Sequence, residues 1–307
     1  MKSFVGAVLT QAISFVLVIL AAYLFKVGRI LEVKDGGTIS KIILNVTLPA
    51  TIIIGFNSVE LNSILLIMIS LGLLTNIVLI AIGGFIWRKR KTADQALMIF
   101  SQAGYNIGNF TIPFVQGFFP EAIPFIGSFD TGNALMVFGG TPMLADKITG
   151  QNRGTRGTKE VVFQLFRSPT FTTYIIMILL AVINVTIPEN VLSIVELFAS
   201  GNAFLSMFMI GLYLEVTISR SDLKKVAQLL FTRYTLGILF ALASYFLLPL
   251  PEIVRLSLVL LALAPIATVS TINMVVYGNK ESLSGFLSSS SIILSLLFMT
   301  AALALIM

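Results

Sequence analysis

Apolar runs long enough to cross a lipid bilayer follow one another along almost the entire chain. Of its 307 residues, 57% are hydrophobic and only 11% are charged, whereas a soluble domain has about 25% charged residues. The mean hydropathy is +0.98. Because a spanning helix needs about 20 mostly apolar residues, the sequence predicts an all-α membrane protein with many spans.

Charged residues and clusters of Pro and Asn divide the chain into ten such runs. Each run is predicted to form a transmembrane helix. The predicted helices lie near residues 4–25, 39–56, 61–87, 94–117, 121–145, 169–187, 190–214, 226–248, 253–277 and 282–306.

The basic residues indicate how these helices are oriented. Apart from Lys2 and Arg255, all of the 20 Lys and Arg residues are assigned to loops that follow odd-numbered helices. Arg233 is counted in this set, so no basic residue is expected inside a span. Basic loops stay in the cytoplasm, which predicts a cell-membrane protein with both termini outside. This topology also explains the net charge of +6 without a nucleic-acid partner.

The longest loop divides the ten predicted helices into two sets of five. We take residues 1–147 and 168–307 as two repeats, and residues 148–167 as a flexible, basic cytoplasmic linker. Because five is an odd number, the second set starts from the opposite face of the membrane. The halves are therefore predicted to be inverted repeats, on topology and not on matching residues.

Two predicted helices contain residues that interrupt helical backbone. Residues 104–113 in helix four hold two glycines, two asparagines and a proline, and residues 263–271 in helix nine surround Pro265. Broken backbone survives at this depth only where protein or water covers it. Breaks in corresponding helices of two halves indicate the binding site of a secondary transporter. The alternative is a pair of packed proline kinks.

New helix ends at these breaks would suit an anion. A helix N-terminus presents free N–H groups and a partial positive charge, so two facing ends can hold a carboxylate without Lys or Arg. Asn45, beside Pro49 in helix two, is expected to line the substrate path unless that pair only kinks the helix. The other expected substrate-binding residues are Asn106, Gly108, Asn109, Pro113, Pro265, Thr268 and Ser270.

Two acidic residues fall well inside predicted spans, away from their ends. Asp130 lies near the bilayer centre in helix five, where an ionisable group is costly and marks a candidate functional site. With Asn133 it is our candidate for coupling to a proton or Na⁺, and the alternative is an Asp that fixes helix five against helix four. Glu196 in helix seven lies nearer the surface, and its role stays open. The serine-rich residues 282–291 are expected to pack closely against helix nine.

Several motifs, taken together, resemble the auxin efflux carrier family and occur in the order found there. They are Asn45-Val46-Thr47-Leu48-Pro49-Ala50, then Ser101 to Asn109 with Pro113, then Phe129-Asp130-Thr131-Gly132-Asn133, and finally Ala264-Pro265 followed by Tyr277-Gly278-Asn279. The short central loop resembles bacterial members of that family.

This resemblance implies the fold shared with bile-acid symporters, with crossed, broken fourth and ninth helices. It implies a scaffold of helices one, two, six and seven, a mobile core of the other helices, and a homodimer joined through the scaffold. It also implies elevator-type alternating access for a small organic anion, auxin-like or similar to malate or malonate.

Other functions are favoured less by the residues present. The chain has no His and no Cys, so a catalytic zinc site of the usual kind is excluded. An intramembrane aspartyl protease needs two close carboxylates, and only Asp130 lies deep. We therefore expect neither an enzyme nor a bound cofactor. A Na⁺-coupled carrier of a larger organic anion, and a membrane sensor or assembly protein without transport, stay open as alternatives.

Overall fold

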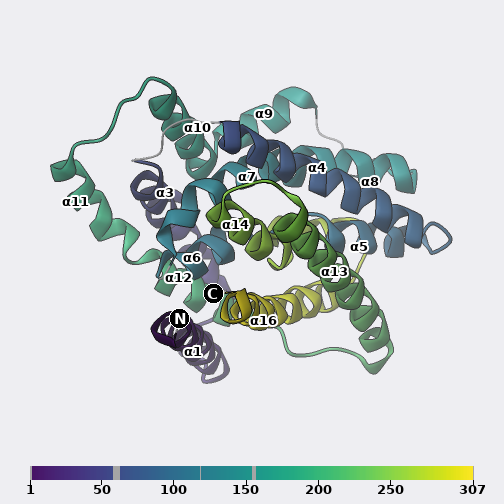
Figure 1. The fold of residues 1–307 in the computed structure, drawn as a ribbon. Helices are drawn as coiled ribbons and strands as arrows, with labels where there is room; N and C mark the ends of the chain where they lie inside the picture. The colour runs from purple at the N-terminus through teal and green to yellow at the C-terminus, as the bar shows by residue number, and fades with distance from the viewer. Residues whose placement is uncertain (1, 58–62, 118, 154–156, 307) are drawn as a thin grey trace.

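The computed structural model describes residues 2–57, 63–117, 119–153 and 157–306, and these residues form helices joined by short connections (Figure 1). The first half contains α1 (Lys2–Val27), α2 (Val33–Ile42), η1 (Ile43–Thr47), α3 (Leu48–Phe56), α4 (Ser63–Ile86), α5 (Thr92–Gln102), η2 (Ile107–Thr111), α6 (Ile112–Gln116), η3 (Pro120–Ala122), α7 (Ile123–Leu135), η4 (Met136–Gly140) and α8 (Thr141–Thr149). The second half contains α9 (Thr158–Phe166), α10 (Pro169–Val182), α11 (Glu189–Ala199), α12 (Asn202–Tyr213), α13 (Arg220–Leu247), α14 (Glu252–Ala262), α15 (Thr268–Val276) and α16 (Glu281–Ile306).

Six helical segments within the described residues are long and apolar enough to cross a membrane. A seventh is added if α9 and α10, which meet at an angle of 81°, are counted as one span. The predicted helices four, five and nine are each built from shorter helices, and α10 has only 14 residues. The described part of the chain is therefore all-helical, with several helices that are long and apolar enough to span a membrane.

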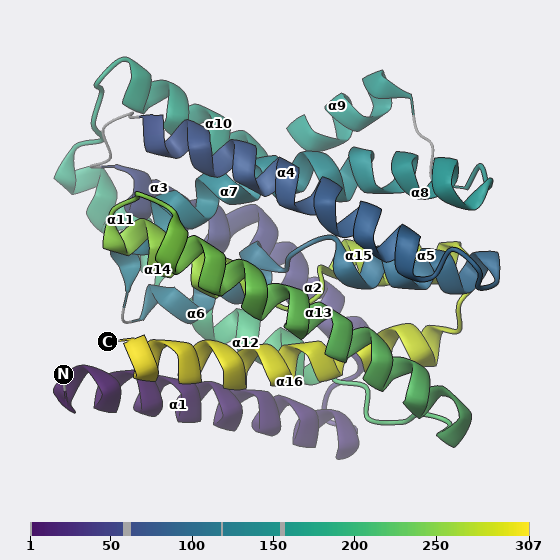
Figure 2. The ribbon, with the colours of Figure 1, turned by 45° about the vertical axis from the view of Figure 1, so that its right-hand side comes forward.

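The helices pack in two groups. In the first, which we call the α1 group, α1 packs along α12, α2 packs against α12, and α3 packs against α10 and α11. In the second, the α4 group, α4 packs along α5 and α7, and α13 packs along α14. Figure 2 shows α16 of the α4 group lying between α1 and α13, so this helix lines the boundary between the groups.

The α4 group contains an unusually close helix contact. A Cβ added to Gly72 would lie 2.1 Å from the carbonyl oxygen of Phe129, and one added to Gly132 would lie 2.0 Å from that of Ile69. Each of these two glycines thus lets α4 and α7 approach to backbone contact, as small residues do in membrane helices.

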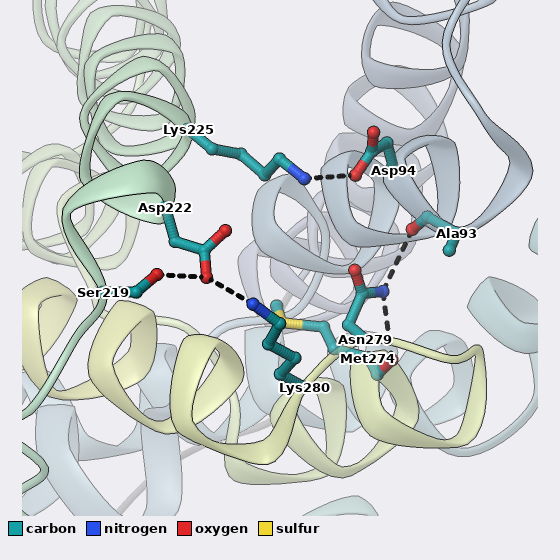
Figure 3. A network of polar contacts seen from close by, with 8 residues as sticks. All are labelled: Ala93, Asp94, Ser219, Asp222, Lys225, Met274, Asn279 and Lys280. Carbon is teal, nitrogen blue, oxygen red and sulfur yellow. Dashed lines mark hydrogen bonds and ion pairs between the residues drawn. The ribbon is translucent and has the colours of Figure 1, made fainter.

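Polar contacts join α5, α13, α15 and α16 at the end of these helices that carries Lys225 and Lys280, which we call the basic end (Figure 3). Lys225 of α13 pairs with Asp94 of α5 at 2.6 Å, and Lys280, just before α16, pairs with Asp222 at 3.1 Å. The Asn279 side chain donates to the carbonyl oxygen of Ala93 at 3.0 Å and to that of Met274 in α15 at 3.1 Å. These bonds hold the ends of α5, α13, α15 and α16 in one body.

The expected flexible linker is partly helical. Residues Thr158–Phe166 form α9, which follows Gly157 directly and ends two residues before α10. Its apolar side chains Val162, Phe163 and Phe166 are exposed. The expected linker over residues 148–167 therefore contains a helix in its second half, and the apolar face of this helix suits a membrane surface.

Candidate functional site

The chain leaves helical geometry at both of the sites where the sequence predicts a break. Helix α5 ends at Gln102, Ala103 is extended, and Gly104 takes a φ of +89° before helical structure resumes at Ile107. Helix α14 ends at Ala262, Ala267 is extended, and α15 begins at Thr268. A φ of +89° is easily adopted only by glycine, which explains the residue type at position 104.

The two interrupted segments face one another. Tyr105 and Ile266 form an isolated antiparallel bridge, and the Asn106 N–H donates to the carbonyl oxygen of Pro265 at 2.9 Å. The two breaks therefore meet at one place, which we call the crossing. Their crossing joins the end of α5 and the start of η2 to the end of α14 and the start of α15.

Asparagine side chains satisfy the open backbone on one side of this crossing. The Gly104 N–H donates to Asn76 Oδ1 at 2.6 Å, and the Tyr105 N–H donates to Asn133 Oδ1 at 3.1 Å. Asn133 Nδ2 returns a bond to the Tyr105 carbonyl oxygen at 3.1 Å. Asn76 was missed by the sequence reasoning, although a lone asparagine in the apolar run of α4 is the signal that would have found it.

Serine side chains hold the other segment. The Ile266 N–H donates to Ser291 Oγ at 3.2 Å, and Ser270 Oγ donates to the Ala103 carbonyl oxygen at 3.2 Å. Ser270 was expected to bind substrate, but it is 2% exposed and bonds the end of α5 instead. Its hydroxyl therefore joins the two broken helices.

A cavity of about 780 Å³ lies beside the crossing. Residues of the α1 group that line it include Lys26, Ser40, Met209 and Tyr213. Those of the α4 group include Asn106, Asn109, Thr268, Thr271 and Ser288. The cavity thus lies at the boundary between the groups and reaches from the crossing towards Lys26, Glu215 and Glu281 at the basic end of the helices.

Three of the predicted substrate-binding residues come together in this cavity. Asn106 precedes the first residue of η2, Asn109 lies within η2, and Thr268 is the first residue of α15. Asn109 Oδ1 is buried without a hydrogen-bond partner. Since the first N–H groups of a helix have no acceptor within it, both helix starts add donors and partial positive charge here. The arrangement is suited to an anion that also carries a hydrogen-bond donor.

The remaining predicted residues shape the crossing from outside the cavity. Gly108 faces Leu48, whose Cδ2 would lie 2.8 Å from an added Cβ. Pro113 is buried at the start of α6, which continues η2 without a break, so its missing N–H removes one backbone donor from this helix. Asn45 is exposed, and its Nδ2 donates to the Lys41 carbonyl oxygen at 2.6 Å. The structure does not bring Asn45 to the cavity.

Asp130 and Asn133 lie on the side of the crossing that Asn76 occupies. Asp130 accepts hydrogen bonds from Asn133 Nδ2 at 3.0 Å and from the Tyr174 hydroxyl at 3.2 Å. Neither Asp130 nor Asn133 lines the large cavity. The bond to Tyr174 joins α7 of the α4 group to α10 of the α1 group. Asp130 is therefore a polar link between the two groups of helices.

Arg233 corrects one sequence-based expectation. It lies inside α13, it is only 5% exposed, and its guanidinium group reaches the crossing. Nη1 donates to the carbonyl oxygens of Ser101 and Gln102, and Nη2 to those of Gly104 and Ala264, at 2.7 to 3.2 Å. The expectation that no basic residue lies inside a span was wrong, because the loop assignment ignored the position of Arg233 about two turns beyond the start of the apolar run.

Glu196, the serine-rich residues 282–291 and a further residue, Asn202, can also be placed. Glu196 is exposed on α11, away from the cavity. Asn202 is fully buried in α12, where its Oδ1 accepts from Thr47 Oγ1 at 3.0 Å. In the serine-rich start of α16, Ser284 and Ser291 are buried in helix contacts, while Ser282, Ser288 and Ser289 line the cavity.

Comparison with protein-family models and with curated proteins gives no match for this chain. The candidate site is therefore defined by its geometry. Two broken helices cross, a buried arginine lies at the carbonyl ends of α5 and α14, which we call the carbonyl side of the crossing, and a polar cavity lies beside the starts of η2 and α15.

Proposed function

We propose that the protein is a secondary carrier of a small organic anion, and that the anion binds in the cavity beside the crossing. The observation that carries this proposal is the meeting of Asn106, Asn109 and Thr268 at two facing helix starts within one cavity. Each helix start contributes about half an elementary positive charge, so the pair balances one carboxylate. The unpartnered Asn109 Oδ1 is an acceptor for a hydroxyl group of the substrate.

The position of the cavity favours movement of one group of helices against the other. Its walls come from both groups, so a relative shift would close it at the basic end and open it at the other. We propose that the α4 group is the mobile core and the α1 group the scaffold. The close α4–α7 contact and the ion pairs at the basic end support movement of the α4 group as one body.

The finer architecture is part of this proposal. Counting the broken helices as spans gives ten, in two inverted sets of five, with the breaks in the fourth helix of each set. The resemblance to auxin efflux carriers supports this count, a homodimer joined through the α1 group, and a cell-membrane location with both termini outside. It also favours a substrate similar to malate, malonate or an auxin.

Counterflow into proteoliposomes tests the proposed function. Vesicles are loaded with unlabelled malate, malonate or indole-3-acetate, and uptake of the same labelled compound is followed against protein-free vesicles. A carrier of small anions produces a transient overshoot with at least one of them. Binding without counterflow would favour a membrane sensor or assembly protein. Counterflow only with a large anion such as a bile acid would favour a Na⁺-coupled carrier of a larger organic anion.

Asp130 is proposed to couple transport to protons. Because its carboxylate accepts from Tyr174 across the boundary between the groups, its protonation state affects a bond that must break when they move. We expect Asp130→Asn to abolish accumulation driven by an inward proton gradient, up to about tenfold for each pH unit, while exchange persists. Tyr174→Phe removes that bond and keeps the carboxylate, so it is expected to weaken proton-driven accumulation while exchange persists. Full accumulation by Asp130→Asn would show that Asp130 is only structural.

A further inference from the structure

The carbonyl side of the crossing carries a concentration of negative partial charge. Helices α5 and α14 both end there, and the C-terminus of a helix carries about half an elementary negative charge. Two such ends together balance about one positive charge. In secondary carriers, helix C-termini and unwound carbonyls of this kind are where a coupling cation is held.

Arg233 occupies this position. Its two terminal nitrogens donate to four carbonyl oxygens, those of Ser101, Gln102 and Gly104 at the end of α5 and that of Ala264 after α14. Its guanidinium carbon also lies 5.5 Å from the centre of the Tyr105 ring, which adds a cation–π contact. One side chain therefore bonds the ends of both broken helices.

No carboxylate competes for this guanidinium group. Among the described residues, Lys34, Lys225 and Lys280 form the salt bridges, and Arg233 forms none. A buried arginine is costly unless its charge is balanced, and here the balance comes from main-chain carbonyls alone. The α13 helix holds the charge permanently, whereas a metal ion would have to be taken up from solution.

We propose that Arg233 is a built-in cation that takes the place of an alkali metal ion at the crossing, so that neither the fold nor substrate binding depends on Na⁺ or K⁺. This inference rests on the proposed function only for its statement about substrate. Protons are then left as the coupling ion, if the carrier is coupled at all, and Asp130 lies outside the Arg233 contacts.

The first test uses the unmodified protein. Its thermal unfolding midpoint in detergent is measured without substrate in NaCl, KCl and choline chloride at one ionic strength. We expect the same midpoint in all three salts. A midpoint that rises in Na⁺ or K⁺ relative to choline would contradict the proposal, since an alkali ion site would then exist elsewhere in the fold. The result does not depend on whether the protein transports anything.

The second test removes the built-in cation. Arg233→Ala leaves four carbonyl oxygens without their donor, beside an apolar cavity of about 300 Å³ lined by Tyr105, Gly237 and Phe240. We expect the midpoint to fall by at least about 5 °C and to recover by about half when millimolar guanidinium or Na⁺ replaces choline. Guanidinium is small enough to enter the space that the side chain leaves. An unchanged midpoint, or a loss that neither cation reduces, would contradict the proposal.

Arg255→Ala is the matched control. Arg255 also lies near a tyrosine ring, 5.0 Å from the centre of Tyr245, but donates to a single carbonyl oxygen, that of Tyr245 at 2.9 Å. Its loss should create no response to guanidinium or Na⁺. If Arg233→Ala does not fold, Arg233→Lys is used. It keeps a cation at the carbonyl groups but cannot reach four acceptors, so its midpoint is expected to fall less and, as in the natural protein, to be the same in NaCl, KCl and choline chloride. Counterflow that requires Na⁺ would overturn the inference and leave the carrier function intact.

Discussion

Gly104→Ala is expected to abolish transport and to lower the stability of the protein. An alanine at a φ of +89° costs about 1–2 kcal/mol, and its Cβ would lie 2.5 Å from Ser270 Oγ and 3.2 Å from Val137 Cγ2. Moving Ser270 aside breaks its bond to Ala103, which costs about 1 kcal/mol more. The total is about 2–3 kcal/mol, placed where the two broken helices meet. Counterflow and the thermal unfolding midpoint measure both effects.

Gly150→Ala separates the backbone cost from the crowding. Gly150 also has a positive φ, +66°, but nothing lies within 4 Å of an added Cβ. We expect the Gly150→Ala variant to lose only the stability that an alanine at positive φ costs, and to keep transport. The double variant Gly104→Ala with Ser270→Ala removes the crowded hydroxyl and is expected to recover part of the stability. If Gly104→Ala transports as well as Gly150→Ala, the geometry of the crossing does not limit transport.

Asn109→Ala is expected to weaken substrate binding about 10- to 100-fold while the fold stays intact. The side chain lines the cavity at the start of η2, and its Oδ1 has no partner within the protein. Without this acceptor the hydroxyl group of the bound substrate loses its partner, which costs about 1–3 kcal/mol, close to one to two powers of ten in affinity. Because the fold does not use this acceptor, the unfolding midpoint of the substrate-free protein should hardly change. The concentration of anion that gives half-maximal counterflow is the measurement.

Asn45→Ala is the control for that variant. Asn45 is exposed and bonds only within its own turn of helix, and it does not line the cavity. Its removal should leave the half-maximal concentration unchanged. Equal loss of affinity in the Asn45 and Asn109 variants would place the substrate on a different path from the cavity beside the crossing.

The sequence predicted the breaks well because they depend on local chemistry. Glycine adopts a positive φ at little cost and proline removes a backbone donor, so Gly104 and Pro265, each beside small or polar residues, marked both breaks without knowledge of the fold. The same holds for Asn106, Asn109 and Thr268, which lie next to the breaks and face the cavity.

Residues distant in sequence could not be assigned in this way. Ser270 faces the end of α5 and not the cavity, and this depends on how α15 is rotated against its neighbours. Arg233 was assigned to a loop because charge normally marks a loop in a membrane protein. Its partners are carbonyl groups, which every residue carries, so no pattern of side chains in the sequence predicts the contact. Asn76 was missed for the same reason: it bonds the backbone of Gly104.

Substrate protection of a single cysteine tests the central claim most directly. The natural chain has no cysteine, so Ser288→Cys places one thiol in the cavity wall and Ser221→Cys places a control thiol at the exposed basic end. Labelling by a small water-soluble maleimide is timed with and without the anion that gives counterflow. At about ten times its Kd, that anion should slow labelling of Ser288→Cys about tenfold and leave Ser221→Cys unchanged. Equal labelling rates of Ser288→Cys with and without a transported anion would contradict the binding site proposed for it.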